Sequence, residues 1–188
     1  CLGAKLLDIV PMRKITFAPG EFYHIYNRGV ERRTVFENKQ DYFRFIHDLF
    51  VFNNSEYVTP SNVRLASRNP SQAATEALTQ CLEAKLPNIV PKKPRKLLVH
   101  ILAFCCMPNH FHLLLQERIP NGISQFMHKL GTGYTNYFNL KYGHTGSLFQ
   151  GTFKSVPVEK DAHFLYLPCY IHTNPLSIFE PEWKLQGL

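Results

Sequence analysis

A β-hairpin over residues 97–117 is the feature that most constrains how this chain folds. Residues 97–107 are almost continuously apolar, which favours a buried strand. Pro108 and Asn109 follow, and this pair is typical of a tight turn, because proline sets its own φ and asparagine tolerates the next position. Residues 110–117 then predict the second strand. A chain built around such a hairpin contains an antiparallel sheet.

The second strand of this hairpin carries two histidines on one face. Side chains alternate along a strand, so His110 and His112 point the same way, roughly 6–7 Å apart. That spacing allows both imidazoles to bind one metal ion, although a His-x-His strand is more often just a pair of surface histidines. The opposite face is wholly apolar and belongs in the core: Phe111, Leu113 and Leu115.

The other predicted elements complete an α+β fold. Alternation of bulky and polar residues predicts a strand at 22–28, and apolar residues at three- and four-residue spacing predict a helix at 41–52. The same criteria predict a helix at 123–142, a strand pair or bulged strand at 147–158, and a last helix at 161–173. We therefore expect an antiparallel sheet with helices packed on one face.

Residues 53–96 differ in composition from the rest of the chain. They are rich in asparagine and proline and poor in aromatic residues, so we interpret them as an insertion with a short helix near 72–86. The insertion lies within a single domain, 12–178, between an N-terminal extension (1–11) and a C-terminal tail (179–188). Residues 1–11 match residues 81–91 at 8 of 11 positions, a repeat that is too short to be a solenoid unit.

The composition favours a polyanionic partner and argues against several classes of protein. The chain has 21 Lys and Arg against 14 Asp and Glu, a net charge of +7, which favours contacts with phosphates. Its five cysteines lack C-x-x-C spacing, which argues against a disulfide framework or a zinc–thiolate site and for reduced thiols. The longest apolar run is too short to span a bilayer, and no signal-peptide layout is present. We expect a cytoplasmic protein without membrane contact.

Four blocks of the sequence stand in an order that a known protein family shows. They are residues 23–29 (Tyr-His-Ile-Tyr-Asn-Arg-Gly), 107–115 (Met-Pro-Asn-His-Phe-His-Leu-Leu-Leu), 143–155 and 161–175. Together they resemble the REP-associated tyrosine transposases, single-tyrosine members of the HUH superfamily that are related to insertion-sequence transposases. The block around the two histidines looks like the HUH signature itself (His, hydrophobic, His). The resemblance covers about 12–52 and 97–178, and it implies a ferredoxin-like (RRM-like) HUH endonuclease core.

The resemblance also implies an active site. It makes Tyr170 the nucleophile, and His110, His112 and Asn174 the ligands of Mg²⁺ or Mn²⁺. Residues four apart on a helix share a face, so Tyr170 and Asn174 are expected to point together. From the residues alone, two alternatives stay open. Tyr166 is a rival nucleophile one turn earlier, and Asn174 has the alternative role of a C-cap, since asparagine is a common helix terminator, although we favour the ligand.

Basic side chains near this site are expected to contact DNA phosphates. The candidates are Arg28, Arg32, Arg33, Lys92, Lys93, Arg95, Lys96 and Lys154. Phe149 and Phe153 are able to stack on bases, but we favour the interpretation that both belong to the core. The resemblance implies single-stranded or hairpin DNA as the partner, with a tetranucleotide beside the hairpin. It also implies either a monomer or a homodimer that exchanges the nucleophile helix.

The resemblance implies a metal-dependent endonuclease and strand transferase for single-stranded DNA. Such a transposase cleaves at hairpin-flanked sites through a 5′-phosphotyrosine intermediate. Two residues depart from the family's pattern, since Pro168 interrupts the nucleophile helix and Cys169 stands where a basic residue is common. They leave a second hypothesis, a domesticated protein that binds structured DNA or RNA without cleaving it. An HUH replication initiator or relaxase is a third, but such proteins are usually larger and multidomain.

Overall fold

The hairpin lies within a four-stranded sheet in which all neighbouring strands are antiparallel. The computed structural model describes residues 15–56 and 95–179. The strands are β1 (Phe22–Arg28), β2 (Val99–Met107), β3 (His110–Glu117) and β4 (Lys154–Pro157). Their spatial order is β2-β3-β1-β4, so the histidine-bearing strand β3 is hydrogen-bonded on both sides. The two histidines are therefore attached to a central strand and not to a loop.

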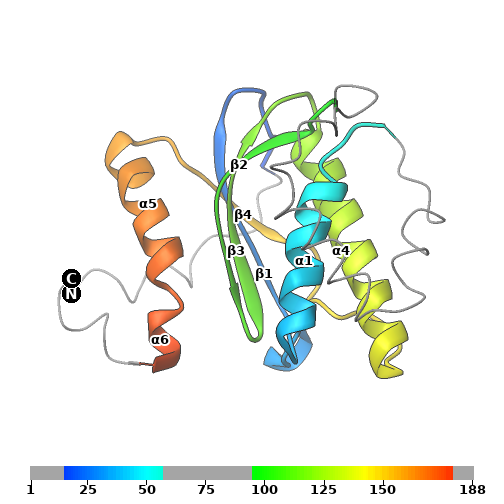
Figure 1. Cartoon of the computed structure of the whole chain (residues 1–188). Coiled ribbons are helices and arrows are strands. Elements are labelled where there is room, and N and C mark those ends of the chain that lie inside the picture. The colour runs from blue at the N-terminus through cyan, green and yellow to red at the C-terminus, as the bar shows by residue number, and fades with distance from the viewer. Residues whose placement is uncertain (1–14, 57–94, 180–188) are drawn as a thin grey trace, which may run out of the picture.

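Helices cover both faces of this sheet, as Figure 1 shows. Helices α1 (Lys39–Val51) and α4 (Gly122–Tyr142) pack on one face, and α5 (Asp161–Thr173) packs on the other. The order of elements and of strands is that of the ferredoxin-like fold, which confirms the expected α+β class. The one difference from the expected arrangement is α5, which covers the histidine-bearing face. That face needs cover because part of it is apolar, namely Ala103, Cys105, Met107 and Leu114.

Two short helices complete the described elements. A 3-10 helix, η1 (Val30–Arg32), follows β1, and α6 (Leu176–Phe179) follows α5. Of the helices in the described parts of the chain, none combines the length and the hydrophobicity that crossing a bilayer requires.

The main core lies between the sheet and helices α1 and α4. Alternation along β3 sends Phe111, Leu113 and Leu115 to this side. All three are fully or almost fully buried, together with Ile25 of β1. The helices meet them with large side chains at helical spacing. These are Phe45 of α1 and Phe126, Leu130 and Tyr134 of α4.

Local sequence signals set the ends of the helices. At the start of α1, the Asn38 side chain accepts a hydrogen bond from a backbone N–H, and the Asp41 carboxylate accepts one from the Asn38 N–H, which together form a capping box. Helix α4 ends at Gly143, whose φ of 61° lies in the left-handed region that glycine adopts without strain. Pro175 follows the end of α5, as expected for a residue that cannot continue a helix.

The segment 147–158 differs from the prediction of a strand pair or bulged strand. Only Lys154–Pro157 is a strand, and Phe149 makes one isolated bridge with Gly29. Gly146 and Gly151 adopt positive φ values of 88° and 66°, which break the extended conformation on both sides of that bridge. Phe149 is buried among the core aromatics, and Phe153 packs partly buried against Phe17. This confirms Phe149 as a core residue, whereas Phe153 lies at the edge of the core and also lines a groove beside β4.

The two ends of the predicted insertion meet in space. The Ser55 N–H donates to the Lys96 carbonyl at 2.8 Å. The buried Asn53 side chain donates to the Val99 carbonyl and accepts from the N–H groups of Leu98 and Val99. These bonds tie the end of α1 to the start of β2. The predicted helix near 72–86, the repeat and the candidate residues Lys92 and Lys93 lie outside the described residues.

A matched pair of glycines in α4 tests how closely α1 and α4 approach. A Cβ on Gly133 would overlap the ring of Phe52, whereas one on Gly131 meets nothing within 4 Å. Gly133→Ala is therefore expected to lower the free energy of unfolding by about 1–3 kcal/mol through overpacking. Gly131→Ala should raise it by about 0.5–1 kcal/mol, since alanine favours helix. Urea unfolding of both variants measures the difference, and equal stabilities would contradict the packing described here.

Candidate functional site

Polar side chains gather on the sheet face that α5 covers. Residues paired across antiparallel strands share a face of the sheet. One row across the four strands is Cys105, His112, Tyr26 and Lys154. The adjacent row, nearer the hairpin turn, is Met107, His110 and Arg28. Two cationic side chains, Arg28 of β1 and Lys154 of β4, thus lie on the same surface as the two predicted histidines, both on the β1 side of β3.

The two histidines have a geometry that suits a shared cation. Their ring centroids are 5.0 Å apart and the ring planes are nearly perpendicular, at 88°. Two imidazoles that bind one cation at about a right angle, through nitrogens at about 2.1 Å, hold their centroids roughly 5 Å apart. His112 is buried, at 5% exposed, and His110 is half-buried. The pair is therefore not two loose surface side chains.

Each of these histidines has a hydrogen-bond partner at its Nδ1 atom. Nδ1 of His110 lies 2.6 Å from Oδ1 of Asn109, and Nδ1 of His112 lies 2.9 Å from Nε2 of His24. His24 is 8% exposed, and burial, with a smaller effect of the nearby His163, lowers its pKa to about 4. Sequence reasoning missed His24. The signal that could have found it is the alternation along β1, which places His24, Tyr26 and Arg28 on one face.

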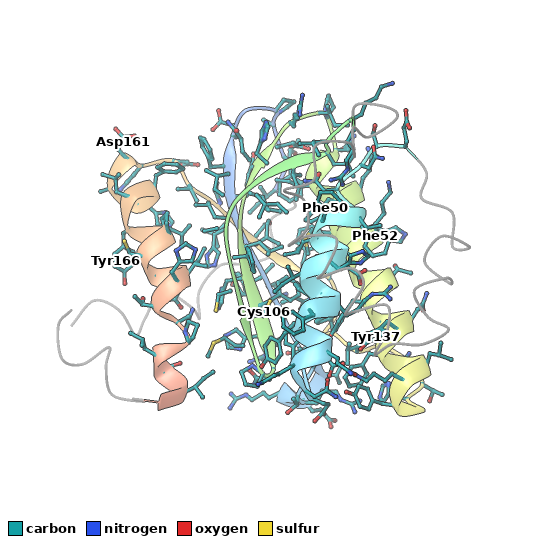
Figure 2. The ribbon with its side chains drawn as sticks, in the orientation of Figure 1. Phe50, Phe52, Cys106, Tyr137, Asp161 and Tyr166 are labelled. Atoms are coloured by element: carbon teal, nitrogen blue, oxygen red, sulfur yellow. The ribbon has the colours of Figure 1, made fainter. Side chains whose placement is uncertain are left out.

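Helix α5 brings Tyr170 to the histidines. The Tyr170 ring lies 5.9 Å from the His112 ring and 6.4 Å from the His24 ring, edge-on to both. Leu167 and Ile171 of α5 are buried in the apolar cluster of this face, which fixes the side of the helix that meets the sheet. Figure 2 shows side chains filling the space between α5 and the sheet. Tyr166 is 61% exposed and stacks on Tyr170 with ring centroids 6.1 Å apart. Of the two rival tyrosines, Tyr170 is the one against the histidines.

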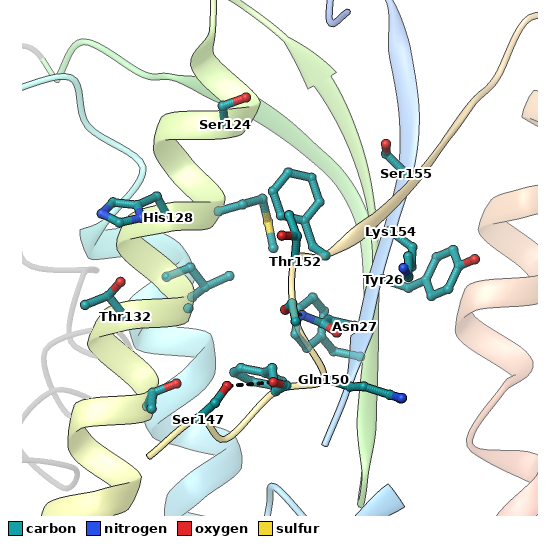
Figure 3. A pocket seen from close by; sticks show the side chains of 18 of the residues that line it. Tyr26, Asn27, Ser124, His128, Thr132, Ser147, Gln150, Thr152, Lys154 and Ser155 are labelled. Atoms are coloured by element: carbon teal, nitrogen blue, oxygen red, sulfur yellow. Dashed lines mark hydrogen bonds between the residues drawn. The ribbon is translucent and has the colours of Figure 1, made fainter. Parts of the chain in front are cut away.

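A second phenol, that of Tyr26, also belongs to this site. Its ring lies 5.8 Å from that of His112, and its side chain points from β1 toward α5 in Figure 3. Burial, and next the proximity of Tyr170, raise the pKa of Tyr26 above its ordinary value. Tyr26 was not among the predicted site residues, because a tyrosine on a half-buried strand carries no local sign of function.

Asn174 stands one turn after Tyr170 and is 3% exposed. Its φ and ψ, −53° and −39°, are those of an ordinary helical residue, so the backbone does not require asparagine there as a left-handed C-cap would. Helix α5 runs toward the end of the sheet where β2 and β3 are joined (Figure 1). Asn174 is therefore nearer to that end than Tyr170, and on β3 His110 is nearer to that end than His112. The helix is continuous from Asp161 to Thr173 in spite of Pro168.

The predicted basic residues are not all near this site. Arg28 and Lys154 are exposed on the site face, where Nε of Arg28 donates to the Gln150 side chain. Arg32 is exposed in the turn after β1. The structure gives two others partners away from the histidines. Arg33 contacts His144 and the Phe138 ring, and Arg95 contacts the Phe50 ring and the carbonyls of Phe50 and Asn53, while Lys96 is exposed.

A groove opens at the sheet edge beside β4, as Figure 3 shows, and apolar side chains such as Phe17, Phe111 and Phe149 make up most of its lining. It has a volume of about 1190 Å³, lies between α4 and the segment 147–156, and reaches Tyr26 and Lys154. Hydroxyl, amide and imidazole groups line it, including Ser124, His128, Thr132, Ser147, Gln150 and Thr152. The groove can therefore offer hydrogen bonds to a polar ligand that extends from the site face.

The buried His24 makes the stability of the protein depend on pH. Between pH 6.5 and 4 the unfolded chain binds a proton at His24 that the folded protein excludes, because the pKa of His24 is lowered from 6.5 to about 4. The free energy of unfolding is therefore expected to fall as the pH is lowered through this range, by up to about 3 kcal/mol. Urea unfolding at several pH values measures this fall. His24→Gln should remove it, and an unchanged pH dependence in that variant would contradict the assignment.

The sheet topology and the histidine pair that faces a helical tyrosine together indicate the HUH class of transposases. Comparison with known families agrees. The family described as "Transposase IS200 like" matches residues 71–174, more than half of the 188 residues. The chain belongs to this family of IS200-like transposases. The matched range begins within the predicted insertion and contains the predicted nucleophile and the three predicted metal ligands: Tyr170, His110, His112 and Asn174.

A solved structure has a similar fold. It is described as a REP-associated tyrosine transposase bound to a REP hairpin. The similarity has a TM-score of 0.51 at 13% sequence identity and covers 90% of this chain and 74% of that one. At this identity the match supports the fold, which includes β1, outside the range of the family match. The sequence has no match among the curated proteins compared with it.

Proposed function

We propose that this transposase cleaves and rejoins single-stranded DNA at hairpin-flanked sites, in a metal-dependent reaction with Tyr170 as the nucleophile. The observation that carries the proposal is the placement of the Tyr170 ring 5.9 Å from that of His112, over the sheet face that also holds His110. A nucleophilic phenol beside a cation site is what phosphoryl transfer through a covalent intermediate requires.

His110, His112 and Asn174 are the residues that would hold the cation. Among the residues that the structure describes, no group of three or more His, Cys, Asp and Glu side chains could hold a metal ion. An amide oxygen of Asn174 is therefore the candidate for the third ligand. Such a mixed nitrogen and oxygen set suits Mn²⁺ and tolerates Mg²⁺. When bound, the cation polarises the scissile phosphate and stabilises the charge that develops on its oxygens.

Tyr170 carries the covalent step. Its phenol loses a proton, and the oxygen attacks phosphorus while the bond between phosphorus and the 3′ oxygen breaks. The departing 3′ oxygen takes up a proton, and the 5′ phosphate stays on Tyr170. One phosphate ester bond replaces another, so a 3′-OH can later attack the phosphotyrosine and restore a DNA strand without an external energy source.

The set of proposed site residues comes from a single chain. Tyr170 lies against the histidines of its own chain, as the contact between its ring and that of His112 records. A monomer can therefore form the proposed site, and a homodimer that exchanges the nucleophile helix is the alternative. Mixing a Tyr170→Phe variant with a His112→Ala variant tests the point, since exchange would restore activity and a monomer would not.

The DNA partner should contact Arg28 and Lys154, which are exposed on the same sheet face as the histidines. Arg28→Gln or Lys154→Gln is expected to reduce the slope of log K against log salt concentration for a DNA hairpin by about 1. Lys39→Gln, an exposed change at the start of α1 on the opposite side, is the control. Filter binding over a salt series measures the slopes. Slopes equal to that of the unaltered protein would show that neither residue contacts the DNA.

A labelled oligonucleotide tests the proposed function directly. The protein is incubated with DNA hairpins that flank its own gene, in Mn²⁺ and in EDTA, and run on a denaturing gel. A labelled protein band in Mn²⁺ alone is the expected result. Tight hairpin binding without any such band would instead support the alternative function, a domesticated binder of structured DNA or RNA.

A further inference from the structure

Two residues outside the proposed ligand set hold the histidine rings by the same atom. We propose that His24 and Asn109 are positioning residues, which hold Nδ1 of His112 and Nδ1 of His110 so that both rings present Nε2 to one cation. The inference rests on the proposed function, because it concerns the same cation site. It adds the two partners that orient the ligands.

The partner of His110 determines which of its nitrogens carries the proton. Oδ1 of Asn109 lies 2.6 Å from Nδ1 of His110, and an amide oxygen only accepts hydrogen bonds. Nδ1 is therefore the protonated nitrogen, and the lone pair is on Nε2. Asn109 is itself held in the hairpin turn, since its carbonyl accepts from the Gly29 N–H and its Nδ2 donates to the Arg32 carbonyl.

The partner of His112 does the same from the neighbouring strand. Nε2 of His24 lies 2.9 Å from Nδ1 of His112, and the two rings are stacked with an angle of 24° between their planes. The backbone register of β1 and β3 fixes both residues, and both are buried. When His112 donates from Nδ1 to His24, its Nε2 carries the lone pair that a cation needs.

Both proposed ligands thus have a hydrogen-bond partner at Nδ1, one from the hairpin turn and one from β1. Partners at the second ring nitrogen commonly fix the tautomer and orientation of a metal-binding histidine, and their loss weakens metal affinity by about 10–100-fold. His24 and Asn109 need no contact with DNA or with the cation to have this effect. Their role can be separated from that of Arg28 and Lys154, which are exposed on the site face and are proposed to contact DNA.

Mn²⁺ titration of the full chain without DNA tests this inference. By calorimetry, His24→Leu is expected to weaken Mn²⁺ binding about 10–100-fold, because leucine removes the acceptor. His24→Gln should restore binding to within about threefold of the unaltered protein, since its amide oxygen can accept from Nδ1. His100→Leu, an exposed change near the start of β2, is the matched control and should bind normally. Asn109→Ala should weaken binding as His24→Leu does.

Circular dichroism and a thermal melt establish that each variant is folded before the titration. A second measurement is independent of any substitution: nitrogen-15 NMR of the unaltered protein should find the proton of His110 and of His112 on Nδ1. Normal Mn²⁺ affinity in folded His24→Leu and Asn109→Ala would overturn the positioning role and leave the cation site standing. No Mn²⁺ binding by the unaltered protein would overturn the cation site, and the positioning role with it.

Discussion

Tyr170→Phe is expected to abolish covalent capture of DNA, by at least about 10³-fold, and to leave hairpin affinity unchanged within about twofold. The substitution removes one oxygen atom, and that atom is the proposed nucleophile. The ring contacts with His112 and His24 stay, so α5 keeps its packing on the sheet. Denaturing gels measure the adduct, and filter binding measures the affinity.

Two other tyrosines provide matched controls. Tyr166 stacks on Tyr170 from the exposed side, and Tyr26 approaches from β1. Tyr166→Phe should leave the adduct yield near that of the unaltered protein, because its phenol is not needed. Peptide mapping of the adduct should find the DNA on Tyr170 and not on Tyr26. An adduct that persists in Tyr170→Phe and maps to either neighbour would contradict the assignment.

His112→Ala and His110→Ala are the second pair of changes with large effects, and each is expected to lower the adduct yield in Mn²⁺ by about 10²-fold or more. Each removes one of the proposed cation ligands, and one remaining histidine with an amide binds a divalent ion weakly. His112→Ala should also lower the free energy of unfolding by about 1–3 kcal/mol, since it leaves the buried His24 without its hydrogen-bond partner.

The comparison between the two variants separates chemistry from stability. His110 is half-buried and His112 is buried, so His110→Ala should cost less stability while it costs as much activity. Urea unfolding and the adduct assay, run on the same preparations, provide both numbers. Hairpin affinity in EDTA should stay within about twofold for both. If the loss of adduct yield is proportional to the loss of unfolding free energy in both variants, the histidines act only through the stability of the fold.

Much of the fold followed from local patterns. The hairpin at 97–117, the strand at 22–28 and the helices at 123–142 and 161–173 stand within two residues of their predicted ends. The segment 147–158 does not form the predicted strand pair, because Gly146 and Gly151 interrupt the extended conformation and Phe149 is buried in the core. An alternating pattern alone does not reveal where a partner strand stops pairing.

The site was predicted in part, and its assignment as a cation and nucleophile site stays a proposal. Alternation placed His110 and His112 on one face, and helical spacing placed Tyr170 and Asn174 together. Sequence reasoning did not find His24 or Tyr26, since both lie in β1 and acquire their meaning only from its register with β3. It also included Arg33 and Arg95 in a basic surface, and the structure gives both partners elsewhere.

The sequence by itself determined which side chains share a face of their own strand or helix. The period of a strand is two residues and that of a helix is 3.6, so a pair such as His110 and His112 is set within one short segment. Only the tertiary structure decided which faces meet. His24 and His112 are 88 residues apart in sequence and 2.9 Å apart in space, through the pairing of β1 with β3. Tyr170 lies against these histidines because α5 buries the apolar part of the same sheet face. This packing joins segments that are distant in sequence, so no single segment determines it.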